Sequence, residues 1–164
     1  MCRTLNIQLL LFILLTPCVF ALPTDMHQKL HILADAGSYN YKTGVNIYEG
    51  HVKVDQGASH LTADKLITKS NPKHEIQEAT AYGLLALAHY WTIPKLGEAE
   101  IHAHAEIIRF FPIRDNLTLE KQVFVTQGEN NFRGELVYID NNKETITVPP
   151  TKTNRAVLVY DPDK

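Results

Sequence analysis

The sequence predicts an all-β protein built from short antiparallel strands, and three observations predict it. Apolar residues recur with a period of two, as in Val45-x-Ile47 and Val52-x-Val54, which gives each strand one apolar and one polar face. Turn-forming residues arrive about every eight to twelve positions, a spacing typical of an antiparallel meander or roll. The third observation is an internal repeat.

The strands follow one another along the chain with recognisable turns between them. Alternation covers residues 45–54, 61–67, 117–125 and 132–148. Residues 79–89 are rich in Ala and Leu, but the flanking Tyr90-Trp91-Thr92-Ile93 run is strongly β-prone, so we expect strands there too. The candidate turns are Lys42-Thr43-Gly44, Gln56-Gly57, Asn71-Pro72, Gln127-Gly128 and Asn141-Asn142.

The repeat relates the two halves at a constant offset of 71 residues, without a gap from residue 31 to residue 67. The pattern Val-x-Val-x-Gln-Gly occurs at 52–57 and again at 123–128. His31 falls on His102, Asp35 on Glu106 and Asp64 on Glu135. We interpret the halves, about 31–67 and 102–138, as two copies of one multi-strand unit that cover each other. The paired acids suit turn capping better than chemistry.

The first 21 residues resemble a secretory signal peptide. Arg3 is followed by the apolar run 9–15, and Val19 and Ala21 suit the −3 and −1 positions of a cleavage site after Ala21. Cleavage would leave residues 22–164 as a single domain and would remove both cysteines. The whole chain has 164 residues, a net charge of −2 and a pI of about 6.4, which excludes a basic protein that binds nucleic acid through bulk charge.

Specific motifs resemble the OstA-like domain family of periplasmic lipopolysaccharide-transport proteins. They are Ala34-Asp35, residues 44–50, residues 52–57 and Leu61-Thr62-Ala63-Asp64-Lys65. The second copy carries residues 117–119, 123–128 and 132–135, and the tail 154–162 is similar to the family's closing strand. Lys121-Gln122 departs from the Gly-Asn that usually precedes the second Val-x-Val.

The resemblance implies a twisted, open antiparallel β-jellyroll of about 16 short strands around an apolar trough. It implies a non-enzymatic, cofactor-free bridge protein of the periplasm that takes lipopolysaccharide from an LptC-like inner-membrane component to an LptD-like outer-membrane component. Joining to these partners and head-to-tail self-association would proceed through terminal edge strands. The lipid A acyl chains would be shielded by the trough, since each buried CH₂ contributes about 0.8 kcal/mol.

The candidate groove residues share the alternating apolar face of the two copies. They are Ile47, Val52, Val54, Leu61, Leu119, Val123, Val125 and Phe132. Each of them also suits ordinary core packing. Candidate contacts to lipid phosphates are Arg109, Arg114, Arg133 and Lys65, which would otherwise form a solvated face.

Two other functions compete with a lipid carrier. His102-x-His104-x-Glu106 would place three ligand-type side chains on one face of a strand, as in some zinc sites, although its spacing does not fit a cupin. A β-rich adaptor that binds only proteins is the second alternative. Signals of an enzyme are missing from the sequence, which has no Gly-x-Ser-x-Gly elbow and no Gly-rich phosphate loop.

Overall fold

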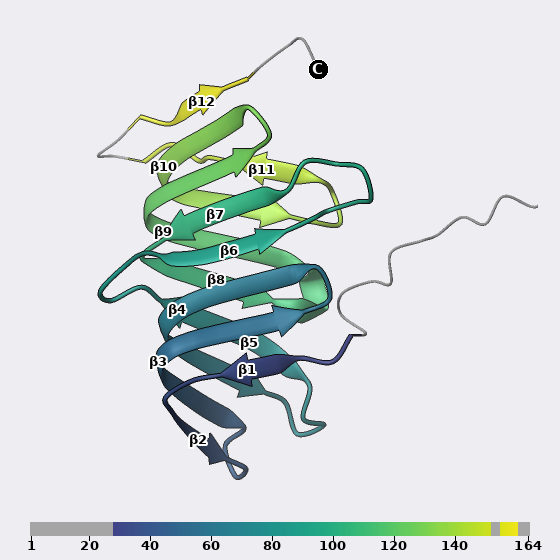
Figure 1. Cartoon of the computed structure of the whole chain (residues 1–164), viewed down its shortest axis with the longest axis vertical. Coiled ribbons are helices and arrows are strands. Elements are labelled where there is room, and N and C mark those ends of the chain that lie inside the picture. The colour runs from purple at the N-terminus through teal and green to yellow at the C-terminus, as the bar shows by residue number, and fades with distance from the viewer. Residues whose placement is uncertain (1–27, 152–154, 161–164) are drawn as a thin grey trace, which may run out of the picture.

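A computed structural model describes residues 28–151 and 155–160. These residues form twelve strands and one short 3-10 turn, and no α-helix (Figure 1). The strands are β1 (His31–Leu33), β2 (Ala36–Asn40), β3 (Val45–Gln56), β4 (Ser59–Ser70), β5 (Ile76–Tyr82), β6 (Ala88–Thr92), β7 (Ile101–Ala105), β8 (Ile107–Phe111), β9 (Asn116–Gln127), β10 (Asn130–Asp140), β11 (Thr145–Thr147) and β12 (Val157–Val159). The expected signal peptide lies outside the described residues. Among the described residues, no helix is long and apolar enough to cross a membrane.

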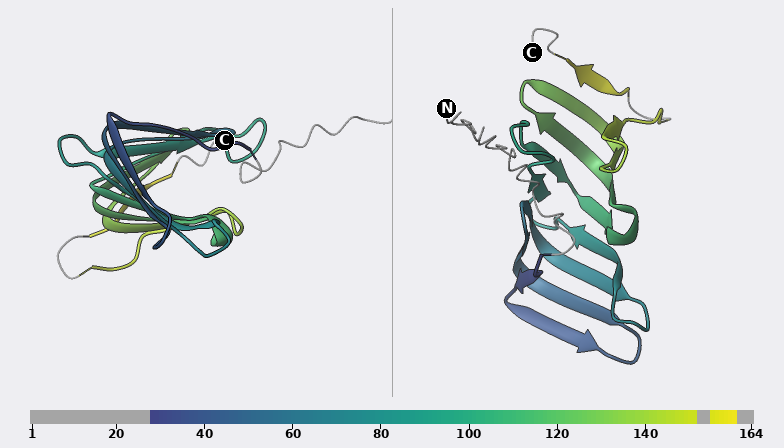
Figure 2. Two further views of the ribbon diagram at one scale, coloured as in Figure 1. Left: turned by 90° about the horizontal axis from the view of Figure 1, so that it is seen from below. Right: turned by 90° about the vertical axis from the view of Figure 1, so that its right-hand side faces the viewer.

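All twelve strands belong to one antiparallel sheet that is folded lengthwise into two leaves. In leaf A the strand order is β1-β3-β4-β6-β7-β9-β10-β12, and in leaf B it is β2-β3-β4-β5-β8-β9-β10-β11. The four long strands β3, β4, β9 and β10 therefore run through both leaves. Seen along its long axis, the sheet has two layers that meet along one side and diverge toward the other (Figure 2, left).

Bulges mark the line where the sheet bends. The register between β3 and β4 shifts between Glu49 and Val52, and the register between β9 and β10 shifts between Gly134 and Leu136. At the bend, Gly50 has a φ of 76° and Lys121 a φ of 64°, a left-handed conformation that strains any residue except glycine. An extra residue in one strand bends that strand and increases its twist, which explains the fold between the leaves.

The two halves have the same strand pairing. Adding 71 residues carries β2 onto β8 and β3 onto β9, and the pair Ala36–Glu49 onto the pair Ile107–Glu120. In the same way, Ile32 lies opposite Val54, and Ala103 lies opposite Val125. The strands β3 to β6 of the first half thus correspond to β9 to β12 of the second half. The Gln-Gly turns also match, since Gly57 and Gly128 have φ values of 60° and 59°.

The all-β, antiparallel architecture is confirmed, and the expected number of about 16 strands needs a correction. The described residues form twelve strands because each of the four long strands crosses the bend as one continuous strand with a bulge.

The Ala- and Leu-rich segment is split between two strands and a loop. β5 ends at Tyr82, β6 begins at Ala88, and residues 83–87 form a loop at the bend. Glycine is required at the start of this loop, because a Cβ on Gly83 would collide with the Ala86 carbonyl oxygen. The Asp64 carboxylate caps the loop, since its Oδ2 accepts hydrogen bonds from the backbone N–H groups of Leu84 and Leu85, each at 2.6 Å.

The core lies between the leaves, along the inner side of the bend. Its fully buried side chains include Ile108, Leu117, Leu119, Val125 and Val137, each no more than 1% exposed. They come from β8, β9 and β10, in the middle and the second half of the sheet. Away from the bend the leaves separate, and the same apolar inner face becomes the wall of a groove.

Candidate functional site: an apolar groove between the two leaves

The inner faces of the two leaves enclose an open groove with a volume of about 540 Å³. Leaf A contributes residues of β1, β3, β4, β6, β7 and β9, and leaf B contributes residues of β4, β5, β8, β9, β10 and β11. The apolar lining consists of Leu30, Ile32, Val54, Ala58, Leu61, Leu66, Ile76, Ala79, Ala81, Tyr90, Ile93, Pro94, Ile101, Ile108, Phe110, Pro112, Ile113, Leu117, Ile139 and Ile146. Such a surface suits acyl chains, which gain free energy when they leave water.

Cross-strand ladders explain why these residues converge on the groove. In leaf B, Ala79 lies opposite Phe110, which lies opposite Leu117, and Leu117 lies opposite Ile139. In leaf A, Leu61 pairs with both Val54 and Tyr90. Because side chains directly opposite each other in a sheet share a face, each ladder forms an apolar row across the strands.

The structure places the predicted groove residues in three different environments. Val54 and Leu61 line the groove. Val52, Leu119, Val123 and Val125 are at most 3% exposed and belong to the core, and the half-buried Phe132 packs against that core. Ile47 lies on the outer face, because it alternates with Asn46 and Tyr48, of which the first is buried and the second packs on the core.

Sequence reasoning missed the groove-lining residues of β5 and β8. Ala79 and Ala81 alternate along β5, and Ile108 and Phe110 alternate along β8, so the period-two signal is present in both strands. Small alanines and a neighbouring Leu-rich run obscure it in the first case. In the second case, Ile107 and Phe111 make both faces of the strand apolar.

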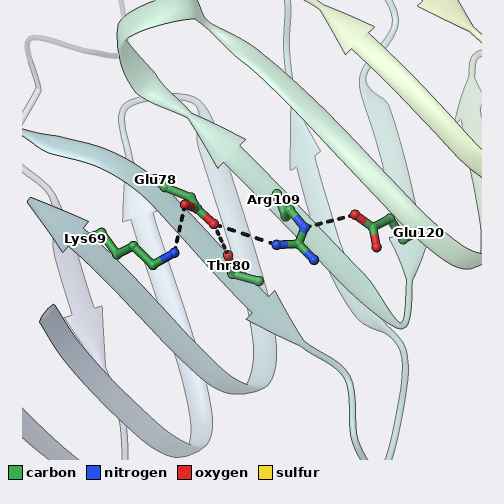
Figure 3. A network of polar contacts seen from close by, with 5 residues as sticks. All are labelled: Lys69, Glu78, Thr80, Arg109 and Glu120. Carbon is green, nitrogen blue, oxygen red and sulfur yellow. Dashed lines mark hydrogen bonds and ion pairs between the residues drawn. The ribbon is translucent and has the colours of Figure 1, made fainter.

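The predicted phosphate contact Arg109 lies on the outer face of leaf B, within a network of ion pairs (Figure 3). Its Nε donates to Glu120 Oε1 at 2.9 Å, and its Nη1 lies 3.7 Å from Glu78 Oε1. Lys69 Nζ donates to the other oxygen of Glu78 at 3.0 Å. The hydrogen bond to Glu120 raises the pKa of Arg109, and the hydrogen bond from Lys69 lowers the pKa of Glu78. The network therefore joins β4, β5, β8 and β9 outside the groove.

The other predicted phosphate contacts also lie away from the groove lining. Lys65 Nζ donates to Glu49 Oε1 at 2.7 Å, on the outer side of the bend. The Arg133 guanidinium lies over the Phe124 ring, 4.6 Å from its centroid. Arg114 is nearest to the groove, since it follows the lining residues Pro112 and Ile113 and lies 5.7 Å from the Phe111 ring centroid.

An ion pair joins the two leaves at the open side of the groove. Lys95 belongs to the loop between β6 and β7, and Glu144 belongs to the turn between β10 and β11; both loops are on the right in Figure 1. Lys95 Nζ contacts Glu144 Oε1, and both residues line the groove. The hydrogen bond to Glu144 raises the pKa of Lys95, so its ammonium group is charged at neutral pH.

The histidines form a stack of rings on the outer face of leaf A, opposite the groove. The His89 ring stacks on His104 at a centroid distance of 4.1 Å and on Trp91 at 4.6 Å. His89 Nε2 and His102 Nδ1 are 3.1 Å apart. Burial, and then the nearby His104 and His102 rings, lower the pKa of His89 to about 4. The His89 ring is therefore uncharged at neutral pH.

This arrangement does not support the metal-site alternative. The His104 ring lies face to face with His89, and the Glu106 carboxylate accepts a hydrogen bond from Gln122 at 2.7 Å beyond the end of β7. In the part of the chain that the structure describes, no group of three or more His, Cys, Asp or Glu residues has a geometry that could hold a metal ion.

The fold and the groove together define a class of protein: a single antiparallel sheet, folded into two leaves that enclose an open apolar groove. Residues 31–145 match the sequence profile of the family described as LptA/(LptD N-terminal domain) LPS transport protein, and the chain belongs to this family.

Two curated relatives and one solved structure specify the similarity. The lipopolysaccharide export system protein LptH of Pseudomonas aeruginosa is 29% identical over 126 residues, which are 77% of this chain and 71% of LptH. LptA of Escherichia coli K12, also a lipopolysaccharide export system protein, is 23% identical over 145 residues, which are 88% of this chain and 77% of LptA. The crystal structure of LptH, described as the LptA-homologous periplasmic component of the lipopolysaccharide transport device of Pseudomonas aeruginosa, superposes with a TM-score of 0.77 at 25% identity. That superposition covers 85% of this chain and all of the LptH chain in the crystal structure.

Proposed function

We propose that this protein is a periplasmic lipopolysaccharide-binding bridge protein that carries its ligand from the inner membrane to the outer-membrane assembly site. The observation that carries the proposal is the open apolar groove between the leaves. Family membership and the names of the export-system relatives support the same ligand. The signal-peptide pattern of residues 1–21 supports delivery to the periplasm.

The folded sheet, an open jellyroll in this proposal, acts as a passive carrier and not as an enzyme. The acyl chains of lipid A lie against the apolar lining, and the sugar part of the lipid remains at the open side, in water. An amphiphile with several acyl chains gains about 0.8 kcal/mol for each CH₂ that it buries. The groove is open along one side, so a ligand can pass along it without a complete return to solvent.

The internal repeat supports head-to-tail association and gives it a residue register. Within the chain, β6 pairs with β7 so that Tyr90 lies opposite Ala103. Leu158 of β12 occupies the place of Tyr90, because it lies opposite Phe132 as Tyr90 lies opposite Leu61. Ile32 of β1 in the same way occupies the place of Ala103. The edge of β12 in one copy therefore fits β1 of a second copy, with Leu158 opposite Ile32.

The same correspondence applies to leaf B and to the two membrane components. β11 takes the place of β5, and β2 takes the place of β8, so β11 of one copy fits β2 of the next. An LptC-like protein at one end and an LptD-like protein at the other would extend the sheet by the same strand addition. The groove would then continue from one protein to the next.

Site-specific photo-crosslinking in cells tests the proposed ligand. A benzoyl-phenylalanine at Val54, which lines the groove, should form a crosslink to lipopolysaccharide. The same group at Lys53, on the outer face of the same strand, should not. If neither Val54 nor Leu61 yields a lipid adduct and delipidated protein does not take up lipopolysaccharide, the protein-only adaptor replaces the lipid carrier.

Disulfide trapping tests the proposed register between copies. The chain after residue 21 contains no cysteine, so Ile32→Cys and Leu158→Cys proteins can be mixed and oxidised. This pair should form a crosslinked dimer. Val159→Cys with Ile32→Cys should not, because adjacent strand residues point to opposite faces. Equal yields for both pairs would contradict the register.

A further inference from the structure

The cations that sequence reasoning proposed for phosphate recognition do not line the groove, but Lys95 does. Within the described residues, it is the only Lys or Arg among the groove-lining side chains. It lies at the open side, where a polar headgroup would emerge from the apolar lining. A cation at that point is placed to contact an anionic group attached to a ligand whose apolar part is inside.

The partner of Lys95 is easily exchanged. The side chains of Lys95 and Glu144 are 54% and 61% exposed, and ion pairs this exposed to water stabilise a fold only slightly. An anion that replaces the Glu144 carboxylate would therefore keep the charge interaction of Lys95 at little cost to the protein. The released Glu144 would return to solvent from the exposed turn that carries it.

Apart from Lys95, the Lys, Arg, Asp and Glu residues among the described groove-lining side chains are all acidic, so Lys95 is the favoured place for an anion. Glu98, Asp115, Asp140 and Glu144 also line the groove. Asp115 accepts a hydrogen bond from Asn141 at 2.9 Å, and Asp140 pairs with Lys143 at 2.8 Å, so the structure already holds both carboxylates in place. A phosphate is favoured beside Lys95 and disfavoured beside the lining carboxylates.

We propose that Lys95 binds a phosphate group of the carried amphiphile and that Glu144 is the internal carboxylate which this phosphate displaces. The inference rests on the proposed function and specifies its headgroup contact. In the structure, Glu144 neutralises Lys95 across the open side of the groove. When acyl chains enter, the phosphate bound to the acylated sugar takes the place of Glu144, and this contact sets how far along the groove the ligand lies.

Binding measurements with single charge changes test the proposal. The probe is hexa-acylated lipid A with both phosphates, compared with the same lipid A after enzymatic removal of the phosphates. Lys95→Gln should weaken binding of the phosphorylated form about three- to fivefold and leave the dephosphorylated form unchanged. Glu144→Gln should strengthen binding of the phosphorylated form, because the competing carboxylate is removed. The two variants thus shift the affinity in opposite directions.

Three controls separate this from simpler explanations. Lys73→Gln removes the same charge from an exposed position in the turn between β4 and β5, which does not line the groove, and should leave the affinity unchanged. Glu98→Gln removes a lining acid that is not the partner of Lys95, and should strengthen binding less than Glu144→Gln does. Inorganic phosphate at about 10 mM should not compete with lipid A, because the acyl chains supply most of the affinity.

Several outcomes would overturn the proposal. Equal shifts for Lys95→Gln and Glu144→Gln would mean that the pair is only a strap between the leaves. Equal shifts for Lys95→Gln and Lys73→Gln would mean a general field effect. If the wild-type protein binds neither form of lipid A, the proposed function itself fails; if it binds both forms and Lys95→Gln changes neither, only the headgroup contact fails.

Discussion

A carboxylate placed on the groove wall should strongly weaken lipid binding without unfolding the protein, and Leu61→Asp is the variant that tests this. Leu61 lies in the ladder between Val54 and Tyr90, and all three residues line the groove. It is half-buried in the groove wall, so the substituted carboxylate keeps contact with water until a ligand covers it. The fold should therefore tolerate the change better than it would tolerate one in the core.

The expected loss of binding free energy follows from the contacts that the acyl chains would make with the changed side chain. An apolar side chain of this size contributes about 1.5–3 kcal/mol when fully buried, and a half-buried one about half of that. A polar group that the acyl chains cover without giving it a hydrogen-bond partner costs roughly a further 1–3 kcal/mol. The combined loss of about 2–4 kcal/mol corresponds to a dissociation constant roughly 30- to 1000-fold weaker.

Titration of delipidated protein with fluorescent lipid A measures this change, and circular dichroism checks the fold. Thr62→Asp is the matched control, because it introduces the same charge at the next residue of β4, on the outer face opposite His89. Thr62→Asp should bind as the wild type does. If Leu61→Asp also binds like the wild type while remaining folded, acyl chains do not contact this wall and the assignment of the groove is refuted.

Three further predictions concern stability. The pKa of His89 is lowered to about 4, so the unfolded chain takes up a proton more readily than the folded one, and the free energy of unfolding should fall as the pH drops from about 6.5 toward 4. In thermal melts, His89→Gln should reduce this pH dependence. An unchanged dependence of the melting temperature on pH would contradict the assignment. Asp64→Asn removes the charge that accepts the loop N–H groups and should destabilise the protein by about 1–3 kcal/mol in urea unfolding, with faster amide exchange at Leu84 and Leu85. Lys121→Gly relieves the strain of a φ of 64° and should stabilise the protein by about 0.5–1 kcal/mol. Chemical denaturation measures this gain, and its absence would mean that the backbone at the bend is not strained at residue 121.

The sequence predicts the strands well because their cause is local. Period-two alternation is a property of neighbouring residues, and the Gln-Gly turns require a left-handed residue that glycine supplies at 57 and 128. The ungapped offset of 71 residues also has a direct structural counterpart, since both halves use the same pairs of strands. These features do not depend on how the finished sheet is folded.

The groove residues were harder to predict because they depend on where the sheet bends. Val52 and Val54 share a face of β3, but Val52 borders the bulge and is pressed between the leaves, whereas Val54 lies farther out and lines the groove. Ile47 is five residues from Val52, so alternation alone places the two on opposite faces. Its apolar side chain suggested the groove, although it pairs with Ile67 on the outer face.

The proposed phosphate contact Lys95 was missed for a different reason. Arginine was favoured for its bidentate geometry, but Arg109 is held by Glu78 and Glu120 across three strands, a long-range arrangement that no local pattern indicates. Lys95 lies in a loop without periodicity. Only the folding of leaf A over leaf B brings it to Glu144, which is 49 positions away in the sequence.

The repeat has a consequence for how an assembly of such chains would end. The contact between the halves joins two different edges, that of β6 to β7 and that of β5 to β8, and the same two kinds of edge remain unpaired at β12, β1, β11 and β2 within the described residues. An interface between unlike edges does not close on itself, so copies joined in this way would continue as an open filament. Open sheet edges also invite non-native pairing, so a stable bridge needs a different protein at each end. The LptC-like and LptD-like components of the proposed function would therefore cap the filament, in addition to delivering and receiving the lipid. An isolated chain should polymerise further as its concentration rises. Light scattering across a concentration series measures this directly, and a closed dimer at all concentrations would show that the edges pair in another way.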